Sequence, residues 1–129
     1  MALGAANANA SFTGGHRFAA HVALYPTCGT ASIVSGGSGA PVLVLVGTLD
    51  ETTGVRSCER LVADARAAGR DATLIVYEGA YHGWDGDFGG VWFHRAINRS
   101  YAMYPDQSTT QKSRTDVLAF LKKALKLSP

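Results

Sequence analysis

The stretch of sequence that decides the fold runs from residue 41 to residue 50 and reads PVLVLVGTLD. Five consecutive Val and Leu residues with no polar alternation are typical of a central parallel strand, which is buried on both of its faces. The glycine after this run and the polar residues that follow it indicate the turn that leaves such a strand. We therefore predict a buried parallel strand over residues 41–47, with Asp50 just beyond its end.

The segments on either side of this strand extend it into an α/β unit. Residues 55–68 carry apolar side chains at helical spacing, and Gly69 suits the position that ends a helix. Residues 73–77 (TLIVY) are the next strand, and a strand–helix–strand order of this length predicts a parallel pair. Upstream, residues 18–25 (FAAHVALY) form another apolar run, which Pro26 stops. The predicted fold class is α/β: a partial, mostly parallel sheet of about three strands with flanking helices.

The second half of the chain has less periodicity. Residues 78–93 are rich in glycine and aromatic residues, and residues 94–112 are polar and irregular. A final helix is expected over residues 115–127, with Ser113 or Thr115 as its N-cap.

Length and composition exclude several classes of protein. The 129 residues suit a single domain spanning residues 1–129. The net charge is +2 and no basic stripe is present, so we expect no nucleic-acid partner. No apolar run approaches the roughly 20 residues of a membrane span, so we expect no membrane partner. The first ten residues lack the basic and apolar regions of a signal peptide.

A polar side chain follows each of two predicted strands. Asp50 lies three residues past one strand, and His82 lies five residues past the other. The carboxyl ends of parallel strands share one edge of a sheet, where ligands bind. An Asp that accepts from one imidazole nitrogen leaves the other nitrogen free to act as a base. Each residue also has an ordinary interpretation: Asp50 as a turn or helix-cap residue, and His82 as a structural or exposed histidine.

The order Asp then His is the one that α/β-hydrolases use, and the sequence from residue 18 to residue 125 resembles the C-terminal part of the dienelactone hydrolase family. The resemblance is carried by FAAHVALYPTC, PVLVLVGTLD, CERLVADARAAG, LIVYEGAYHGWD and MYPDQSTTQKSRTDVLAFLKKAL, in that order. It implies that Asp50 is the acid and His82 the base of a catalytic triad. It also implies hydrolysis of a small-molecule ester or lactone through a Ser or Cys nucleophile, with no metal or other cofactor.

The nucleophile of such a triad stands on a G-x-S-x-G elbow or its Cys equivalent, upstream of the strand over residues 18–25. Residues 1–8 look like the remnant of the helix that follows an elbow, so we expect the elbow before Met1 and an isolated chain without activity. Three residues inside the chain fit poorly. Ser38, in GGSGA, precedes a strand; Ser11 has no preceding Gly; and no helix motif follows Cys28.

Three other interpretations remain open. Asp50, His82, Asp85 and Asp87 could bind a divalent metal ion, although the i, i+4 histidine spacing of helix-borne zinc sites is absent. The chain could be a small α/β interaction module, with Asp50 as a phosphate acceptor or a simple turn residue. It could also be a truncated paralogue without activity.

Further expectations concern the surroundings of the site. Tyr81 and Trp84 are predicted to contact substrate, together with Phe88 and Trp92.

Cys28 and Cys58 are expected near one sheet edge, either as a disulfide formed in an oxidising compartment or as two ordinary thiols. An uncovered sheet edge also predicts a homodimer or another association through that edge.

Overall fold

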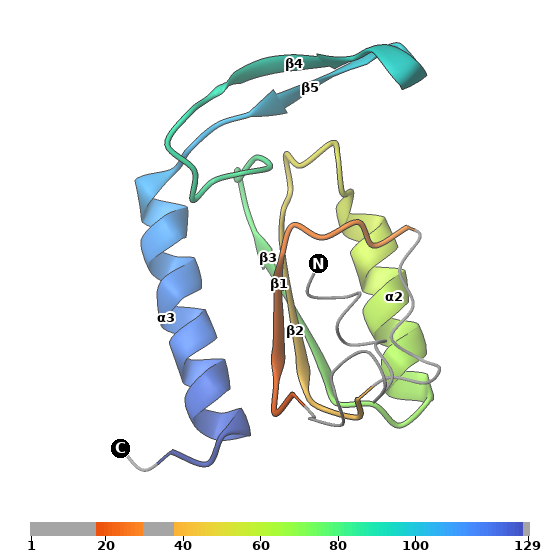
Figure 1. The fold of residues 1–129 in the computed structure, drawn as a ribbon, viewed down its shortest axis with the longest axis vertical. Helices are drawn as coiled ribbons and strands as arrows, with labels where there is room; N and C mark the ends of the chain where they lie inside the picture. The colour runs from red at the N-terminus through yellow and green to blue at the C-terminus, as the bar shows by residue number, and fades with distance from the viewer. Residues whose placement is uncertain (1–17, 30–37, 128–129) are drawn as a thin grey trace.

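The computed structural model describes residues 18–29 and 38–127 (Figure 1). Its parallel sheet has the strand order β1-β2-β3, and a second, antiparallel sheet pairs β4 with β5. The strands are β1 His21–Leu24, β2 Val42–Gly47, β3 Ala72–Tyr77, β4 Gly90–His94 and β5 Arg99–Met103. The helices are α2 Val55–Ala67 and α3 Gln107–Ala124, with the short 3₁₀ helix η1 Arg95–Ile97 between β4 and β5. The predicted fold class is therefore confirmed.

The register of the parallel strands sets the position of the site. Val42 lies between His21 of β1 and Ala72 of β3, and Gly47 at the end of β2 lies opposite Tyr77 at the end of β3. Strands β2 and β3 therefore end at the same level, and the loops that follow them start side by side. Among the described strands of this sheet, β1 is an outer one, and association through its free edge stays a prediction.

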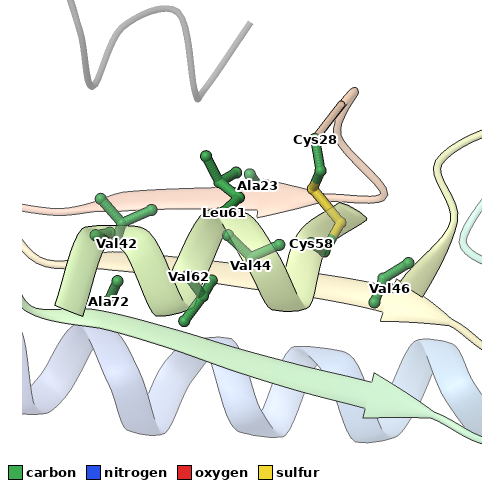
Figure 2. Packing of buried hydrophobic residues seen from close by; sticks show 10 residues of the cluster. Ala23, Cys28, Val42, Val44, Val46, Cys58, Leu61, Val62 and Ala72 are labelled. Atoms are coloured by element: carbon green, nitrogen blue, oxygen red, sulfur yellow. A yellow bond between two sulfur atoms is a disulfide. The ribbon is translucent and has the colours of Figure 1, made fainter. Parts of the chain in front are cut away.

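Helix α2 covers one face of the sheet with apolar side chains (Figure 2). Alternate residues of β2 point to this face, where they pack on one stripe of the helix. The buried side chains are Val42, Val44 and Val46 of β2 and Cys58, Leu61, Val62 and Ala65 of α2. Gly69, with φ of 74°, follows the helix, and its N–H donates to the carbonyl oxygen of Arg66 at 2.9 Å. The helix therefore ends at the glycine that the sequence indicates.

Helix α3 covers the opposite face of the sheet (Figure 1). Leu43 and Leu45, which alternate with those valines along β2, are fully buried there with Trp84. Val117 and Phe120 of α3 pack against this cluster and are only partly buried.

The prediction for the start of α3 was wrong. The helix begins at Gln107, and Asp106 caps it by accepting from the backbone N–H of Thr109 at 2.5 Å. Ser113 and Thr115, the expected caps, lie inside the helix. The first turns lack an apolar stripe because the residues that they bury, Thr109 and Ser113, are polar.

The segment expected to be irregular contains a hairpin. Strands β4 and β5 pair in an antiparallel ladder from Gly90–Met103 to His94–Arg99. The hairpin lies beyond the carboxyl ends of the parallel strands (Figure 1). The apolar residues of β4 are largely exposed, with Val91 65%, Trp92 56% and Phe93 58% accessible. The strand therefore lacks the alternation of apolar and polar residues by which a half-buried strand is recognised in a sequence.

Several expectations concern residues outside the described part of the chain. These are the helix over residues 1–8, Ser11, and the glycines at positions 36 and 37 before Ser38. Within the described residues, no helix is both long enough and apolar enough to cross a membrane.

Candidate functional site

Asp50 is held by the turn that follows β2. Its Oδ1 atom accepts hydrogen bonds from the backbone N–H groups of Thr52, at 2.9 Å, and Thr53, at 2.8 Å. The residue is only 3% exposed. The Oδ1 atom therefore stabilises the turn, as Asp side chains commonly do, and Oδ2 remains available for a second partner.

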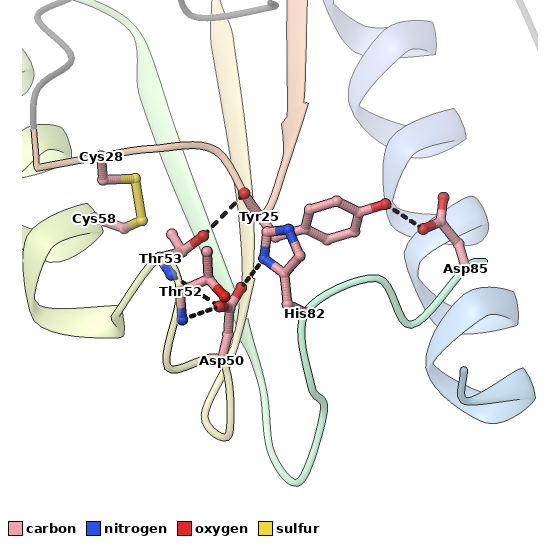
Figure 3. Close-up of polar contacts among 8 residues, drawn as sticks. All are labelled: Tyr25, Cys28, Asp50, Thr52, Thr53, Cys58, His82 and Asp85. Carbon is pink, nitrogen blue, oxygen red and sulfur yellow. Dashed lines mark hydrogen bonds and ion pairs between the residues drawn. A yellow bond between two sulfur atoms is a disulfide. The ribbon is translucent and has the colours of Figure 1, made fainter. Parts of the chain in front are cut away.

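That second partner is His82, on the loop that follows β3. The imidazole Nδ1 lies 2.9 Å from Asp50 Oδ2 (Figure 3). An ionised carboxylate can only accept, so the neutral imidazole carries its proton on Nδ1 and its lone pair on Nε2. Among the described residues, Nε2 has no hydrogen-bond partner. The His82 side chain is 18% exposed, whereas the Asp50 side chain is fully buried.

Gly47 allows the two loops to meet at this distance. The backbone N–H of Leu49 donates to the carbonyl oxygen of Ala80 at 3.0 Å, which joins the Asp50 loop to the His82 loop. A Cβ atom on Gly47 would lie 2.1 Å from that same carbonyl oxygen. Backbone atoms cannot move aside as a flexible side chain does, so a residue with a side chain at position 47 would force the loops apart.

Tyr25 is a residue of this site that sequence reasoning missed. It follows β1, and its ring centroid lies 4.4 Å from that of His82. Its hydroxyl donates to Asp85 Oδ1 at 2.5 Å (Figure 3). Burial, followed by the hydrogen bond and charge of Asp85 and the charge of Asp50, raises the pKa of Tyr25. The hydroxyl therefore stays protonated and remains a donor.

The aromatic residues expected to contact substrate occupy different environments. Trp84 is fully buried, its ring meets Tyr77 edge to face, and its indole N–H donates to Ser113 Oγ at 3.3 Å. The prediction of a substrate-contacting Trp84 is therefore corrected, because the residue belongs to the core. Tyr81 is half-buried and its ring lies 5.1 Å from that of Tyr104, so its substrate role stays a prediction.

Phe88 is 83% exposed and precedes the hairpin, and Trp92 lies on β4. For both residues, contact with substrate likewise stays a prediction.

Cys28 and Cys58 form a disulfide, with their Cα atoms 5.0 Å apart (Figure 2). The bridge joins the segment after β1 to the first turn of α2. Neither sulfur is a thiol in this structure, so Cys28 is not available as a nucleophile.

The described part of the chain gives no support to a metal site. The candidate ligands are engaged elsewhere, since Asp85 is hydrogen-bonded to Tyr25 and Asp50 to His82. Among the described residues, no three His, Cys, Asp or Glu side chains lie close enough together to hold a metal ion.

Comparison with known proteins agrees with this arrangement of strands and loops. A sequence model described as the dienelactone hydrolase family matches residues 1–125. No curated protein sequence matches the chain.

Solved structures similar to the chain come from two bacteria. Esterase 2 of Thermogutta terrifontis, phosphoramylated by tabun, has 16% identity and a TM-score of 0.58, over 85% of this chain and 43% of that one. A protein of Klebsiella pneumoniae subsp. pneumoniae, assigned to the dienelactone hydrolases, has 22% identity and a TM-score of 0.53, over 78% of this chain and 40% of that one.

The native form of the Thermogutta esterase has 24% identity and a TM-score of 0.49, over 70% of this chain and 27% of that one. The chain thus spans less than half of the length of each of these proteins.

Proposed function

Because this chain belongs to the dienelactone hydrolase family, we propose that it carries the acid and the base of a carboxylic ester or lactone hydrolase site. Asp50 is the acid and His82 is the base. The substrate class is a small-molecule ester or lactone, as in the family. The esterase fold of the structural neighbours supports a hydrolase function.

The observation that carries this proposal is the 2.9 Å contact between Asp50 Oδ2 and His82 Nδ1, with Nε2 left without a described partner. Asp50 fixes the tautomer in which Nε2 is basic, and its negative charge stabilises the imidazolium that forms. In acyl transfer, Nε2 accepts the proton of a hydroxyl or thiol as that group attacks the carbonyl carbon. His82 then gives the proton to the departing alkoxide, and water repeats the sequence to release the acid.

No described hydroxyl or thiol hydrogen-bonds to His82 Nε2, and both cysteines are in the disulfide. We propose that the nucleophile and the oxyanion hole, which needs backbone N–H groups beside that nucleophile, come from outside the described residues.

The contacts of Asp50 weigh against a phosphate-acceptor role. Its Oδ1 accepts from two backbone N–H groups, its Oδ2 contacts His82, and its side chain is fully buried. A phosphate acceptor needs an accessible carboxylate oxygen. The truncated paralogue without activity remains as the second candidate, and the same assay separates it from a functional site.

The assay measures p-nitrophenyl acetate hydrolysis by the wild-type chain, His82→Ala, Asp50→Asn and, as a matched control, His94→Ala on the exposed end of β4. We expect slow, non-saturating hydrolysis by the wild type, at most ~10²-fold above His82→Ala, which is the size of general-base catalysis alone. Asp50→Asn should lose most of this excess because it no longer fixes the tautomer. His94→Ala should match the wild type.

Two results would contradict the proposal. Equal rates for the wild type and His82→Ala would remove the base role and favour the inert paralogue. Saturable turnover of ~1 s⁻¹ or more, an ordinary enzymatic rate, that is lost in His82→Ala would show that the chain supplies its own nucleophile.

A further inference from the structure

Tyr25 holds a backbone conformation that a bulky residue seldom adopts. Its φ angle is 39°, in the left-handed region. Such a conformation persists only where the surroundings over-determine it, and it occurs preferentially at functional sites. The surroundings here are specific. The Tyr25 N–H donates to the carbonyl oxygen of Leu45 at 2.7 Å, and its own carbonyl oxygen accepts from Thr53 Oγ1 at 2.9 Å. Cys28, three residues later, is tied to α2 by the disulfide.

This backbone conformation places the Tyr25 ring against two other rings. The ring packs against His82, with centroids 4.4 Å apart and planes inclined at 54°. It also meets the fully buried Trp84 edge to face at 4.9 Å. The hydroxyl, at the far end of the ring, is bonded to Asp85 (Figure 3). The Tyr25 ring is therefore held at its backbone, at its hydroxyl and by its contact with Trp84.

A ring fixed in this way can hold the orientation of the His82 imidazole, which the Asp50 contact alone does not fix. The hydrogen bond at Nδ1 holds one atom of the imidazole, but rotation about the Cα–Cβ and Cβ–Cγ bonds can still tilt the plane of the ring. A second contact, against the ring itself, removes that freedom. The direction in which Nε2 points then depends on Tyr25 as well as on Asp50.

We propose that Tyr25, locked by Asp85, is a positioning residue that fixes the plane of the His82 imidazole and so aims Nε2 at the place of the nucleophile. The proposal rests on the proposed function only in naming His82 as the base. The geometric claim concerns the imidazole alone, so it can be tested without turnover.

The test is nitrogen-15 NMR of the imidazole in the whole chain, with the His82 signals identified by their loss in His82→Gln. In the wild type we expect one dominant neutral tautomer, protonated at Nδ1. In Tyr25→Leu, which removes the aromatic ring, the imidazole can tilt and its Nδ1–H hydrogen bond to Asp50 Oδ2 weakens. The ratio of the Nε2–H to the Nδ1–H tautomer should then rise, by about fivefold for the loss of roughly one net hydrogen bond.

Tyr25→Phe keeps the ring but loses the hydroxyl that Asp85 holds, so it should shift the ratio in the same direction as Tyr25→Leu, and by less. Asp87→Asn removes a carboxylate from the same exposed loop and should leave the ratio unchanged, because Asp87 has no hydrogen-bond partner among the described residues.

A wild-type tautomer ratio in a folded Tyr25→Leu protein would overturn the proposal. If Tyr25→Leu does not fold, Asp85→Ala decides, since Asp85 is exposed and its loss only frees the tyrosine hydroxyl. A shift in the same direction as expected for Tyr25→Leu supports the positioning role, and an unchanged ratio overturns it. A changed ratio together with no His82-dependent ester hydrolysis would contradict the proposed function and leave the positioning role standing.

Discussion

Helices α2 and α3 lie on opposite faces of the same parallel sheet, and they are attached to it by different chemistry (Figure 1). The buried side chains of α2 are Cys58, Leu61, Val62 and Ala65, whereas those of α3 are Thr109 and Ser113. Large apolar residues of α3 remain accessible, with Leu118 59% exposed. Helix α2 is thus held by apolar burial and a disulfide, whereas α3 combines the partly buried Val117 and Phe120 with buried hydrogen-bonding residues.

Three hydrogen bonds from the first turns of α3 and its N-cap converge on one residue near the site. The carbonyl oxygen of Trp84 accepts from Thr110 Oγ1 at 2.9 Å and from the N–H of Asp106 at 2.8 Å, and the Trp84 indole N–H donates to Ser113. Trp84 lies two residues after His82. The difference between the helices therefore indicates a division of roles: α2 stabilises the sheet, and α3 anchors the loop that carries His82.

The largest effect is expected from the disulfide on the α2 face. Its cysteines are 30 residues apart, and a loop of that length predicts a stabilisation of about 3–4 kcal/mol in the chain-entropy model. Urea unfolding of the oxidised protein, beside the double variant Cys28→Ala, Cys58→Ala, measures this difference. Unchanged stability would mean that apolar packing alone secures α2.

The next largest effect is expected from a Leu→Ala substitution, which can be compared between the two helices. Leu61→Ala removes a 6% exposed side chain of α2 and should lower the free energy of unfolding by about 2–3 kcal/mol. Leu118→Ala, on α3, should cost no more than about 0.5 kcal/mol because the side chain is already largely accessible. Equal losses in urea titrations would show that α3 is also held by apolar burial.

A smaller effect is expected from the polar attachment of α3. Ser113→Ala leaves the buried indole N–H of Trp84 without its acceptor, which should cost about 1 kcal/mol. Ser108→Ala, at an exposed position of the same helix, is the control. Tryptophan fluorescence during unfolding can follow both variants. A Ser113→Ala protein as stable as the control would contradict the anchoring role.

The smallest effect is a pH dependence on the α2 side. Burial lowers the pKa of His21 below its usual 6.5, so the unfolded chain binds a proton at a pH where the folded chain does not. The contribution of His21 to stability is therefore complete above pH 6.5 and is lost as the pH falls through the lowered value. Urea midpoints at pH 7.5 and pH 5.5 should differ less in His21→Gln than in the wild type. His94→Gln, at an exposed position, should retain the full difference.

The parts of the molecule that the sequence predicts well are those whose apolar pattern has one interpretation. Strand β2 was expected over residues 41–47 and forms over Val42–Gly47, and α2 matches its periodic segment to within one residue. The start of α3 was missed because Thr109 and Ser113 are buried through hydrogen bonds, which leave no apolar period. The capping signal was present nonetheless: an Asp three residues before a Thr whose N–H it binds.

The site divides in a similar way. Asp50 and His82 lie within five residues of the ends of neighbouring strands, so their proximity could be predicted from strand order. Tyr25 could not be assigned a role, because its partner Asp85 lies 60 residues away in the chain. The loop after β3 carries both His82 and Asp85 and places them against the Tyr25 side chain.

Gly47 gives this arrangement an evolutionary property that its neighbours lack. At most buried positions a lineage can drift by small steps, exchanging one apolar side chain for a slightly larger or smaller one. At position 47 the obstacle is the Cβ atom itself, 2.1 Å from the Ala80 carbonyl oxygen, and every other amino acid begins with that atom. Alanine therefore meets the same barrier as tryptophan, and no graded path leads away from glycine. Descendants of this chain either inherit the closeness of Asp50 and His82 unchanged or lose it in a single step.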